Sequence, residues 1–330
     1  MLRERPSSLR ADASLLAVCA IWGFTFPAIQ LALRDTGPVT FVCLRFALAT
    51  LALALIFGRR AFRIQGVGDC IGTGVPMPPS ASALPCRRNL AGLGYAALMG
   101  LCLASGTVLQ TLGLRLTTVP RSAFITALYV VLVPFLVLAL ERVRPRLSSA
   151  GAVLLALAGL YLLAEPRVSG FNRGDLLTLG CAFAFALHIV IAEIATARHD
   201  PIALAFWQIV TAATLSGLAL TFLERPHFVL TPWTLIALSV TGLLATALAF
   251  GVQMWAQRET SATHAAVIFT AEPVFAALFA YVVQGTVMGP TAFLGGALIL
   301  AGLLLVQVGA RKGKGDLGEP GPRGERVSQG

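Results

Sequence analysis

Long runs of apolar residues, each about 20 residues long, dominate this sequence. We count ten of them, at residues 14–33, 38–57, 90–112, 119–140, 147–164, 174–196, 202–223, 232–254, 264–284 and 290–309. A helix of about 20 residues crosses the hydrocarbon core of a bilayer, and it satisfies its own backbone hydrogen bonds there. The runs are continuously apolar, whereas the strands of a membrane β-barrel alternate polar and apolar residues. The sequence therefore predicts an all-α integral membrane protein with ten transmembrane helices.

The composition supports a lipid environment. Hydrophobic residues make up 57% of the 330 positions and charged residues only 12%, about half the charged fraction of an ordinary soluble domain. Too few charged groups remain to cover a water-soluble globule, so we expect membrane lipid to contact much of the surface. The net charge of +10 comes without an aromatic-interleaved basic stripe, so we expect no nucleic-acid partner.

The distribution of Lys and Arg predicts the orientation. With the N-terminus inside, 18 of the 25 basic residues lie in inner segments and 6 in outer ones, which leaves Arg45 alone within a span. Inner loops carry the excess of Lys and Arg in membrane proteins. We therefore expect both termini to be cytoplasmic and the protein to be a multi-pass protein of the cell membrane.

Two segments have compositions unlike those of the spans. Residues 58–89 are rich in Pro, Gly and Ser and are expected to form a long inner loop. Residues 310–330 are basic with many glycines, and we expect a disordered tail. The six cysteines show no CxxC spacing and the four histidines are scattered, so the sequence predicts neither a metal site nor a bound cofactor.

The two halves of the chain resemble each other. When the sequence is shifted by 143 residues, 121–163 align with 264–306 with nine identities in 43 positions. Each half, 14–164 and 174–309, holds five spans, and an odd number of spans forces the second half to point the opposite way. In agreement, the three arginines within 142–146 align with uncharged residues within 285–289. Inverted repeats of this kind are typical of secondary transporters.

Several motifs, spread over both halves of the chain, match a known family in their order and spacing. They are Trp22-Gly23-x-x-Phe26, Arg45, the string SAFITALYVVLVPFLVLALER at 122–142, GDLLTLGCAFAFALHIV at 174–190 and SATHAAVIFTAEPVFAAL at 261–278. In this order the chain resembles the EamA-type transporters of the drug/metabolite transporter superfamily, over about 14–309. The resemblance implies ten spans in two inverted five-helix repeats, and export or uptake of amino acids, related metabolites or drug-like compounds. In a departure from the family pattern, Gln284 takes the position that matches Glu141 in the first half.

Glu272 and Tyr129 are the first candidates for a substrate or ion pathway. Glu272 lies near the middle of a span, directly before Pro273, and the repeat places Tyr129 at the equivalent position. Because proline frees a backbone carbonyl and opens the helix locally, a carboxylate beside it can bind a proton or a cationic group. A protonated Glu that joins two helices by a hydrogen bond is the structural alternative.

Arg45 and His188 are further polar side chains within spans, where each needs a partner, water or a function. Arg45 either contacts an anionic group of a substrate, or pairs with a carboxylate, or extends to the outer interface. His188 is either a packing residue with a hydrogen bond or part of a proton relay.

Uncharged polar residues and prolines complete the candidates for the pathway. Trp22 and Thr25 lie in a stretch of the first span where Pro27 is expected to bend the helix, and Pro134 and Pro273 are expected to do the same elsewhere. Gln110 and Gln253 suit either substrate contacts or hydrogen bonds between helices.

Arg121 and His264 occupy equivalent positions at the starts of two spans, on opposite sides of the membrane. Inner and outer gates have this placement, and so do ordinary interface anchors. The small residues of spans 147–164 and 290–309 suit close packing, within one chain or in a homodimer.

The hypothesis that follows is a secondary transporter without enzymatic activity, which moves small organic solutes by alternating access. The family resemblance implies efflux across a bacterial cytoplasmic membrane. No GxxxxGK[ST] motif for nucleotide phosphates is present. An integral-membrane enzyme acting on lipid-linked substrates is one alternative, but it requires clustered acids, bases or metal ligands. A membrane scaffold without transport is the other, and it leaves the repeat unexplained.

Overall fold

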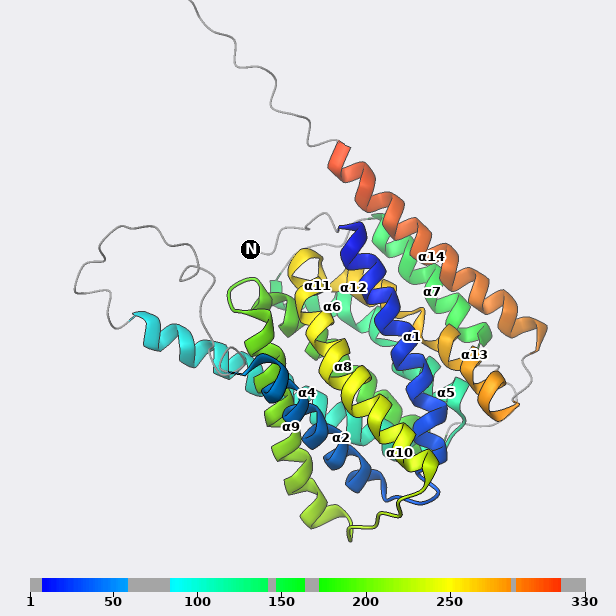
Figure 1. Cartoon of the computed structure of the whole chain (residues 1–330). Coiled ribbons are helices and arrows are strands. Elements are labelled where there is room, and N and C mark those ends of the chain that lie inside the picture. The colour runs from blue at the N-terminus through cyan, green and yellow to red at the C-terminus, as the bar shows by residue number, and fades with distance from the viewer. Residues whose placement is uncertain (1–7, 59–83, 142–146, 164–171, 286–288, 316–330) are drawn as a thin grey trace, which may run out of the picture.

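The chain folds into a bundle of long helices (Figure 1); the computed structural model describes residues 8–58, 84–141, 147–163, 172–285 and 289–315. The first half contributes α1 (Leu9–Ala32), α2 (Pro38–Phe57), α4 (Leu84–Leu114), α5 (Val119–Thr126), α6 (Tyr129–Glu141) and α7 (Leu147–Leu163). The second half contributes α8 (Arg173–Thr196), α9 (Pro201–Leu223), α10 (Pro232–Ser239), the π-helix η4 (Val240–Leu248), α11 (Ala249–Glu259), α12 (Ala262–Phe269), α13 (Glu272–Gln284) and α14 (Pro290–Gly315). The predicted all-α fold is confirmed for the described part of the chain.

Eight helical segments in the described residues are long and apolar enough to cross a bilayer. Two shorter apolar helices, Ala150–Leu162 and Phe293–Leu305, lie within α7 and α14. These segments agree with the predicted integral membrane protein. The count of ten spans and the cytoplasmic location of both termini stay predictions.

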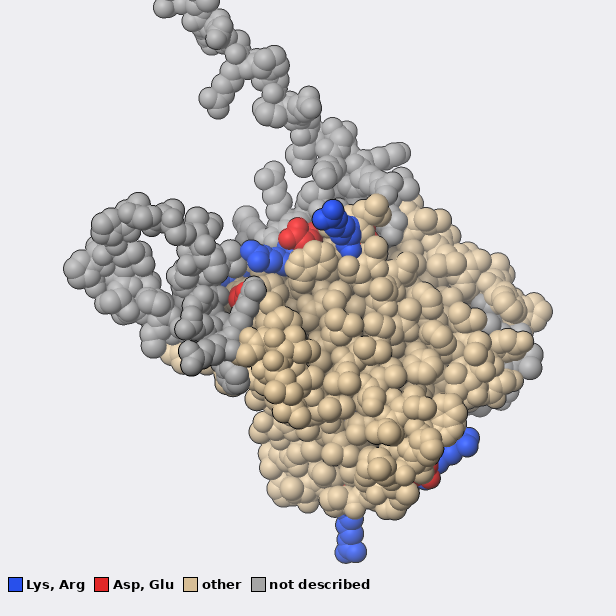
Figure 2. Space-filling model, viewed as in Figure 1, with Lys and Arg blue, Asp and Glu red and all other residues tan. Residues whose placement is uncertain are grey.

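The surface of the bundle is that of a protein in lipid. Large apolar side chains such as Phe222 and Leu55 are 79% and 76% exposed. On the face that Figure 2 shows, the described charged residues lie near the two ends of the bundle and a wide uncharged zone separates them. An apolar belt between two charged ends matches the hydrocarbon core and its two interfaces.

Several boundaries differ from the predicted ones. Helix α4 begins at Leu84, inside the stretch 58–89 that the sequence predicts as a loop, and residues 59–83 lie outside the described residues. Helix α14 continues to Gly315, into the predicted tail, of which 316–330 lie outside the described residues. Three predicted spans, 119–140, 232–254 and 264–284, are not uniform helices: the first and third are interrupted, and the second contains η4.

Local sequence explains where the helices begin. The Asn172 side chain accepts a hydrogen bond from the backbone of Asp175, whose carboxylate accepts one from the backbone of Asn172, and this capping box starts α8. The side chain of Ser8 caps α1 and that of Asp200 caps α9 in the same sense. At its end, α13 stops at Gly285, whose φ of 68° suits a residue without a Cβ.

The interrupted helices lie at the centre of the bundle. Helix α1 packs against α10, η4, α11, α12 and α13, and α8 packs against α4, α5 and α6. Helix α5 packs on α13 and α12 packs on α6, so that the two interrupted spans contact each other along both halves. Helices α7 and α14 lie side by side at one edge (Figure 1). The breaks at 127–128 and 270–271 therefore fall inside the protein, where a site can form.

Candidate substrate cavity

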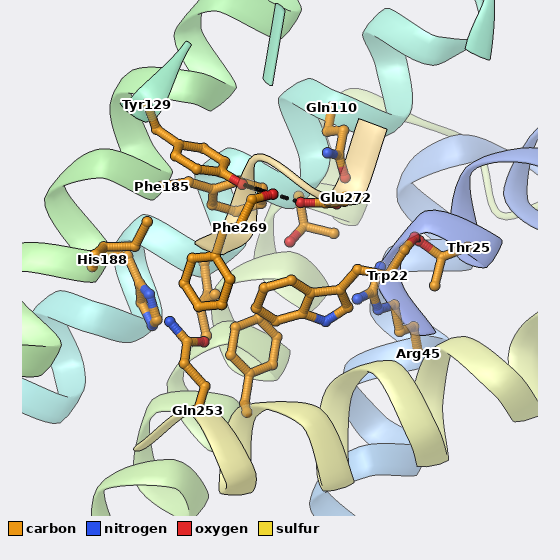
Figure 3. A pocket seen from close by; sticks show the side chains of 14 residues that line it. Trp22, Thr25, Arg45, Gln110, Tyr129, Phe185, His188, Gln253, Phe269 and Glu272 are labelled. Carbon is orange, nitrogen blue, oxygen red and sulfur yellow. Dashed lines mark hydrogen bonds between the residues drawn. The ribbon is translucent and has the colours of Figure 1, made fainter. Parts of the chain in front are cut away.

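One cavity lies where α1, α2, α4, α6, α8, α11, α12 and α13 meet, and all eight residues predicted for a substrate or ion pathway line it (Figure 3). Its volume is about 50 Å³, which is room for a few water molecules. Organic ligands occupy sites of about 300–1,000 Å³. The lining residues are Trp22, Thr25, Arg45, Leu103, Thr107, Gln110, Tyr129, Phe185, His188, Ile189, Phe250, Gln253, Phe269 and Glu272.

Pro273 explains the polar centre of this cavity. A residue at 273 with a backbone N–H would donate to the carbonyl of Phe269 in a continuous helix, but proline has none. The Tyr129 hydroxyl instead donates to that carbonyl at 3.0 Å, and its oxygen lies 3.3 Å from a carboxyl oxygen of Glu272. Figure 3 shows the two side chains pointing toward each other. A carboxyl group, a phenol and a freed carbonyl therefore share one hydrogen-bonded cluster.

Tyr129 and Glu272 hold the same place in the two interrupted spans. Each is the first residue of the helix after a break, α6 for Tyr129 and α13 for Glu272. They are 143 residues apart, and the preceding helices α5 and α12 have bounds that differ by the same shift. Gln110 and Gln253, and also Thr107 and Phe250, line the cavity with this spacing. These three pairs lie on corresponding helices of the two halves, whereas Arg45 and His188, also 143 residues apart, lie on α2 and α8, which do not correspond.

Aromatic rings surround the cluster. The centroid of the Trp22 ring lies 5.4 Å from that of Phe250 and 5.3 Å from that of Phe269. The ring of Tyr129 meets Phe269 edge to face at 6.4 Å, and that of His188 meets Phe250 at 5.7 Å. The face of an aromatic ring carries partial negative charge, so such rings attract cations.

Trp22 is held by a hydrogen bond as well as by packing. Its indole N–H donates to the carbonyl of Ala245 in η4 at 2.8 Å. The next residue, Gly23, lies so close to α13 that a Cβ there would be 2.5 Å from Cβ of Phe275 and 2.8 Å from N of Ala276. The Trp-Gly pair therefore combines a fixed aromatic wall with a close approach of α1 to the helix that carries Glu272.

Arg45 reaches the cavity from α2. It is 5% exposed, and its Nε donates to the hydroxyl of Thr246 at 2.7 Å. That hydroxyl donates in turn to the carbonyl of Thr241, five residues earlier, also at 2.7 Å. Both threonines belong to the π-helix η4, and π-helical turns occur often at functional sites. The η4 segment thus fixes both Trp22 and Arg45.

Three further polar residues of the cavity have side-chain partners, on another helix for Gln110 and His188 and on the same helix for Gln253. Gln110 donates to Thr126 at 3.3 Å, and His188 Nε2 lies 2.8 Å from the side-chain oxygen of Gln208. Gln253 donates to Gln257 at 2.8 Å, while its own side-chain oxygen has no partner among the described residues. That oxygen is an acceptor available to a bound solute.

The other predicted residues lie away from the cavity. Arg121 and His264 contact aspartates at the starts of α8 and α1 rather than each other. Pro27 and Pro134 lie inside α1 and α6, which the structure shows as uninterrupted helices. Of the three prolines, only Pro273 lies in the first turn after a break in its span.

Several structural features of this region could not be predicted from the sequence. The π-helix and the hydroxyl of Thr246 carried no signal in a uniformly apolar run. Phe250 and Phe269 lie in apolar runs without a distinguishing pattern, and no sequence pattern singles out Asp12 or Asp175. The 143-residue shift relates Thr107 to Phe250, just as it relates Gln110 to Gln253. This spacing was a sequence signal that could have identified Thr107 and Phe250 as cavity residues. In the part of the chain that the structure describes, no three His, Cys, Asp or Glu side chains are grouped to hold a metal ion.

Comparison with known proteins gives a consistent result. The EamA-like transporter family matches residues 9–164 and again 172–308. An "Uncharacterized transporter" of Archaeoglobus fulgidus is 32% identical over 306 residues, which cover 92% of this chain and 88% of that protein. The "Uncharacterized transporter YwfM" of Bacillus subtilis is 31% identical over 173 residues, which cover 52% of this chain and 58% of that one.

A solved crystal structure shares the fold. Its TM-score is 0.69 at 17% sequence identity, and the match covers 92% of this chain and 99% of the solved one. Together with the apolar helices, these matches decide the class of the protein. The chain belongs to the EamA-like transporter family, within the drug/metabolite transporter superfamily, and it is a multi-pass membrane protein.

Proposed function

We propose that this protein is a secondary transporter that moves small organic solutes across the cytoplasmic membrane, outward, by alternating access. The observation that carries the proposal is the Tyr129–Glu272 cluster in a buried cavity at the crossing of two interrupted helices. Two matches to one family, at 9–164 and 172–308, support a chain built of two repeats. Such repeats exchange inward-open and outward-open shapes around a central site.

The size of the cavity supports a closed state. About 50 Å³ is too small for an amino acid or a larger metabolite, so a solute binds only when the lining helices move apart. The breaks at 127–128 and 270–271 are places where they can move, because turns with hydrogen bonds between residues three apart replace part of the regular helical pattern there.

The chemistry of the lining favours a solute that carries an ammonium group. The Glu272 carboxylate and the side-chain oxygen of Gln253 accept hydrogen bonds, and the rings of Trp22 and Phe269 present faces to a cation. Arg45 adds a positive group that can bind a carboxylate. An amino-acid-like or cationic drug-like compound meets both requirements.

Glu272 is suited to couple transport to a proton. When the carboxyl group is protonated, it donates to the Tyr129 oxygen while the Tyr129 hydroxyl donates to the Phe269 carbonyl. When it is ionised, the single hydroxyl proton is shared between the carboxylate and that carbonyl. The protonation state of Glu272 thereby changes the hydrogen bonding at the break that precedes α13.

Solute flux into proteoliposomes tests the proposal. Purified protein is reconstituted, and the uptake of radiolabelled solutes is compared among an organic ammonium, a zwitterionic amino acid, a simple carboxylate and a neutral sugar. We expect uptake above protein-free liposomes for the first two and none for the sugar. Transport of no solute under any imposed gradient would contradict the proposal.

A further inference from the structure

Two acid–base pairs connect helices from different halves of the chain, away from the cavity. At one end, Arg121 Nη2 of α5 lies 2.6 Å from a carboxylate oxygen of Asp175 in α8. At the other, His264 Nε2 of α12 lies 3.0 Å from a carboxylate oxygen of Asp12 in α1. We name Asp175–Arg121 the outer pair and Asp12–His264 the inner pair, after the predicted orientation of the chain.

The two pairs occupy matching places in the two halves. Asp12 and Asp175 each lie in the first turn of the helix that begins a half, α1 or α8. Arg121 and His264 are each the third residue of the helix before a break, α5 or α12. Each pair therefore joins the first helix of one half to the interrupted span of the other half.

The pairs lie at opposite ends of the bundle. Helix α5 packs on α13 and α12 packs on α6, so the interrupted spans run antiparallel and their first residues are far apart (Figure 1). Along α1, ten residues separate Asp12 from Trp22 in the cavity lining, or about 15 Å of helix. The same number separates Asp175 from Phe185 along α8. The cavity thus lies between the two pairs.

Each end has a second polar contact, in which the other of the two helices α1 and α8 reaches the start of the same interrupted span. At the inner end, the Glu193 carboxylate of α8 accepts from the backbone N–H of Ala262 at the start of α12. At the outer end, the Gln30 side chain of α1 donates to the carbonyl of Thr117, just before α5. Both ends are therefore closed by polar contacts to the start of an interrupted span.

We propose that the outer and inner pairs hold the two ends of the pathway closed in turn. Opening toward one side breaks the pair at that side, while the pair at the other side stays formed. Both pairs are formed in the structure, and this agrees with a cavity too small for a solute. The inference rests on the proposed transport function.

The two pairs differ in chemistry, and the difference provides a test. Arginine is always charged and forms a strong pair with a buried aspartate, whereas a neutral histidine contributes a hydrogen bond only. Replacing His264 by arginine is expected to strengthen the inner pair, and replacing either base by glutamine is expected to weaken the pair that contains it.

Side-specific labelling of the cavity measures the effect. A Thr25→Cys reporter is placed in the cavity lining, and an impermeant maleimide is applied to right-side-out and to inside-out vesicles. Relative to the reporter protein alone, His264→Gln is expected to raise labelling from the inner side about fivefold or more, and Arg121→Gln from the outer side by as much. Protein without the reporter cysteine corrects for the native cysteines, and Arg115→Gln, at an exposed arginine near Arg121, is the matched control.

Opposite shifts for the two variants support the proposal. Unchanged labelling, or an equal rise from both sides in both variants, overturns it. If the glutamine variants do not fold, His264→Arg gives the reverse test: labelling from the inner side falls about fivefold, and an unchanged level overturns the proposal.

Labelling is recorded without solute, so it reports the pairs independently of transport. If labelling shifts but no tested solute is transported, the closing role of the two pairs is supported and the proposed transport function is contradicted. If labelling is unchanged in a protein that does transport solute, the closing role of the two pairs is contradicted and the proposed transport function is not.

Discussion

Tyr129 and Glu272, 143 residues apart, meet in one hydrogen bond of 3.3 Å at the centre of the molecule. The same tyrosine donates to the Phe269 carbonyl that Pro273 leaves without a helical partner. The hydroxyl oxygen of Tyr129, the carbonyl oxygen of Phe269 and a carboxyl oxygen of Glu272 are therefore hydrogen-bonded through the hydroxyl proton, and through a second proton when Glu272 is protonated. On the proposed function, protonation of this buried carboxyl group changes the hydrogen bonding at the break before α13.

Removal of the tyrosine hydroxyl is the first test of this relationship. Tyr129→Phe leaves the Phe269 carbonyl and Glu272 without this donor, and we expect a loss of about 1 kcal/mol in the free energy of unfolding. Reversible unfolding in detergent measures the loss. The control is Tyr161→Phe at a side chain that is 51% exposed, which is expected to change little. Equal effects of the two variants would contradict the role of the Tyr129 hydrogen bonds.

Restoring a helical donor tests the role of Pro273. Pro273→Ala supplies an N–H that competes with Tyr129 for the Phe269 carbonyl. In that background Tyr129→Phe is expected to cost less, with a coupling of about 0.5 kcal/mol or more in a double-mutant cycle of unfolding free energies. Strictly additive effects would show that the freed carbonyl does not bind the tyrosine.

A pair of glycine substitutions tests the contact between α1 and α13. Gly23→Ala places a Cβ 2.5 Å from that of Phe275, so the helices must separate, and we expect a loss of about 1–3 kcal/mol. Gly251→Ala in α11 meets nothing within 4 Å and is expected to stabilise by up to about 1 kcal/mol, the helix propensity of alanine over glycine. Thermal unfolding of both variants gives the comparison, and similar midpoints would contradict the close approach.

Arg45 is tested by the choice of solute. Arg45→Gln is expected to raise the half-saturating concentration about tenfold for solutes that carry a carboxylate, which corresponds to about 1.4 kcal/mol, and to leave solutes without one unchanged. Thr246→Val, which removes only the hydroxyl bound by Arg45 Nε, keeps the charge and is expected to have the smaller effect. An equal change for both kinds of solute would assign Arg45 a structural role.

Much of this architecture follows from the sequence, and the rest depends on contacts that no local pattern shows. Apolar runs and prolines predict the helical membrane fold, and rare polar groups such as Glu272 and Arg45 identify the cavity because each requires a partner inside lipid. The break at 127–128 has no proline at the position that matches Pro273, and it could not be read from the run around it. The π-helix that holds Trp22 and Arg45 depends on packing against α1 and α2. The pairing of Asp12 with His264 joins residues 252 apart, which neither helix alone predicts.

Proton movement in proteoliposomes tests whether Glu272 couples transport to a proton. Lumenal pH is recorded while an ammonium-bearing solute is added, for the unchanged protein, for Glu272→Gln, and for Glu224→Gln as a control. The Glu224 carboxylate binds the start of α2 outside the cavity. We expect solute-dependent proton movement that Glu272→Gln abolishes and Glu224→Gln retains. Proton movement that persists in folded Glu272→Gln, or solute transport without any proton movement, would contradict the role given to Glu272.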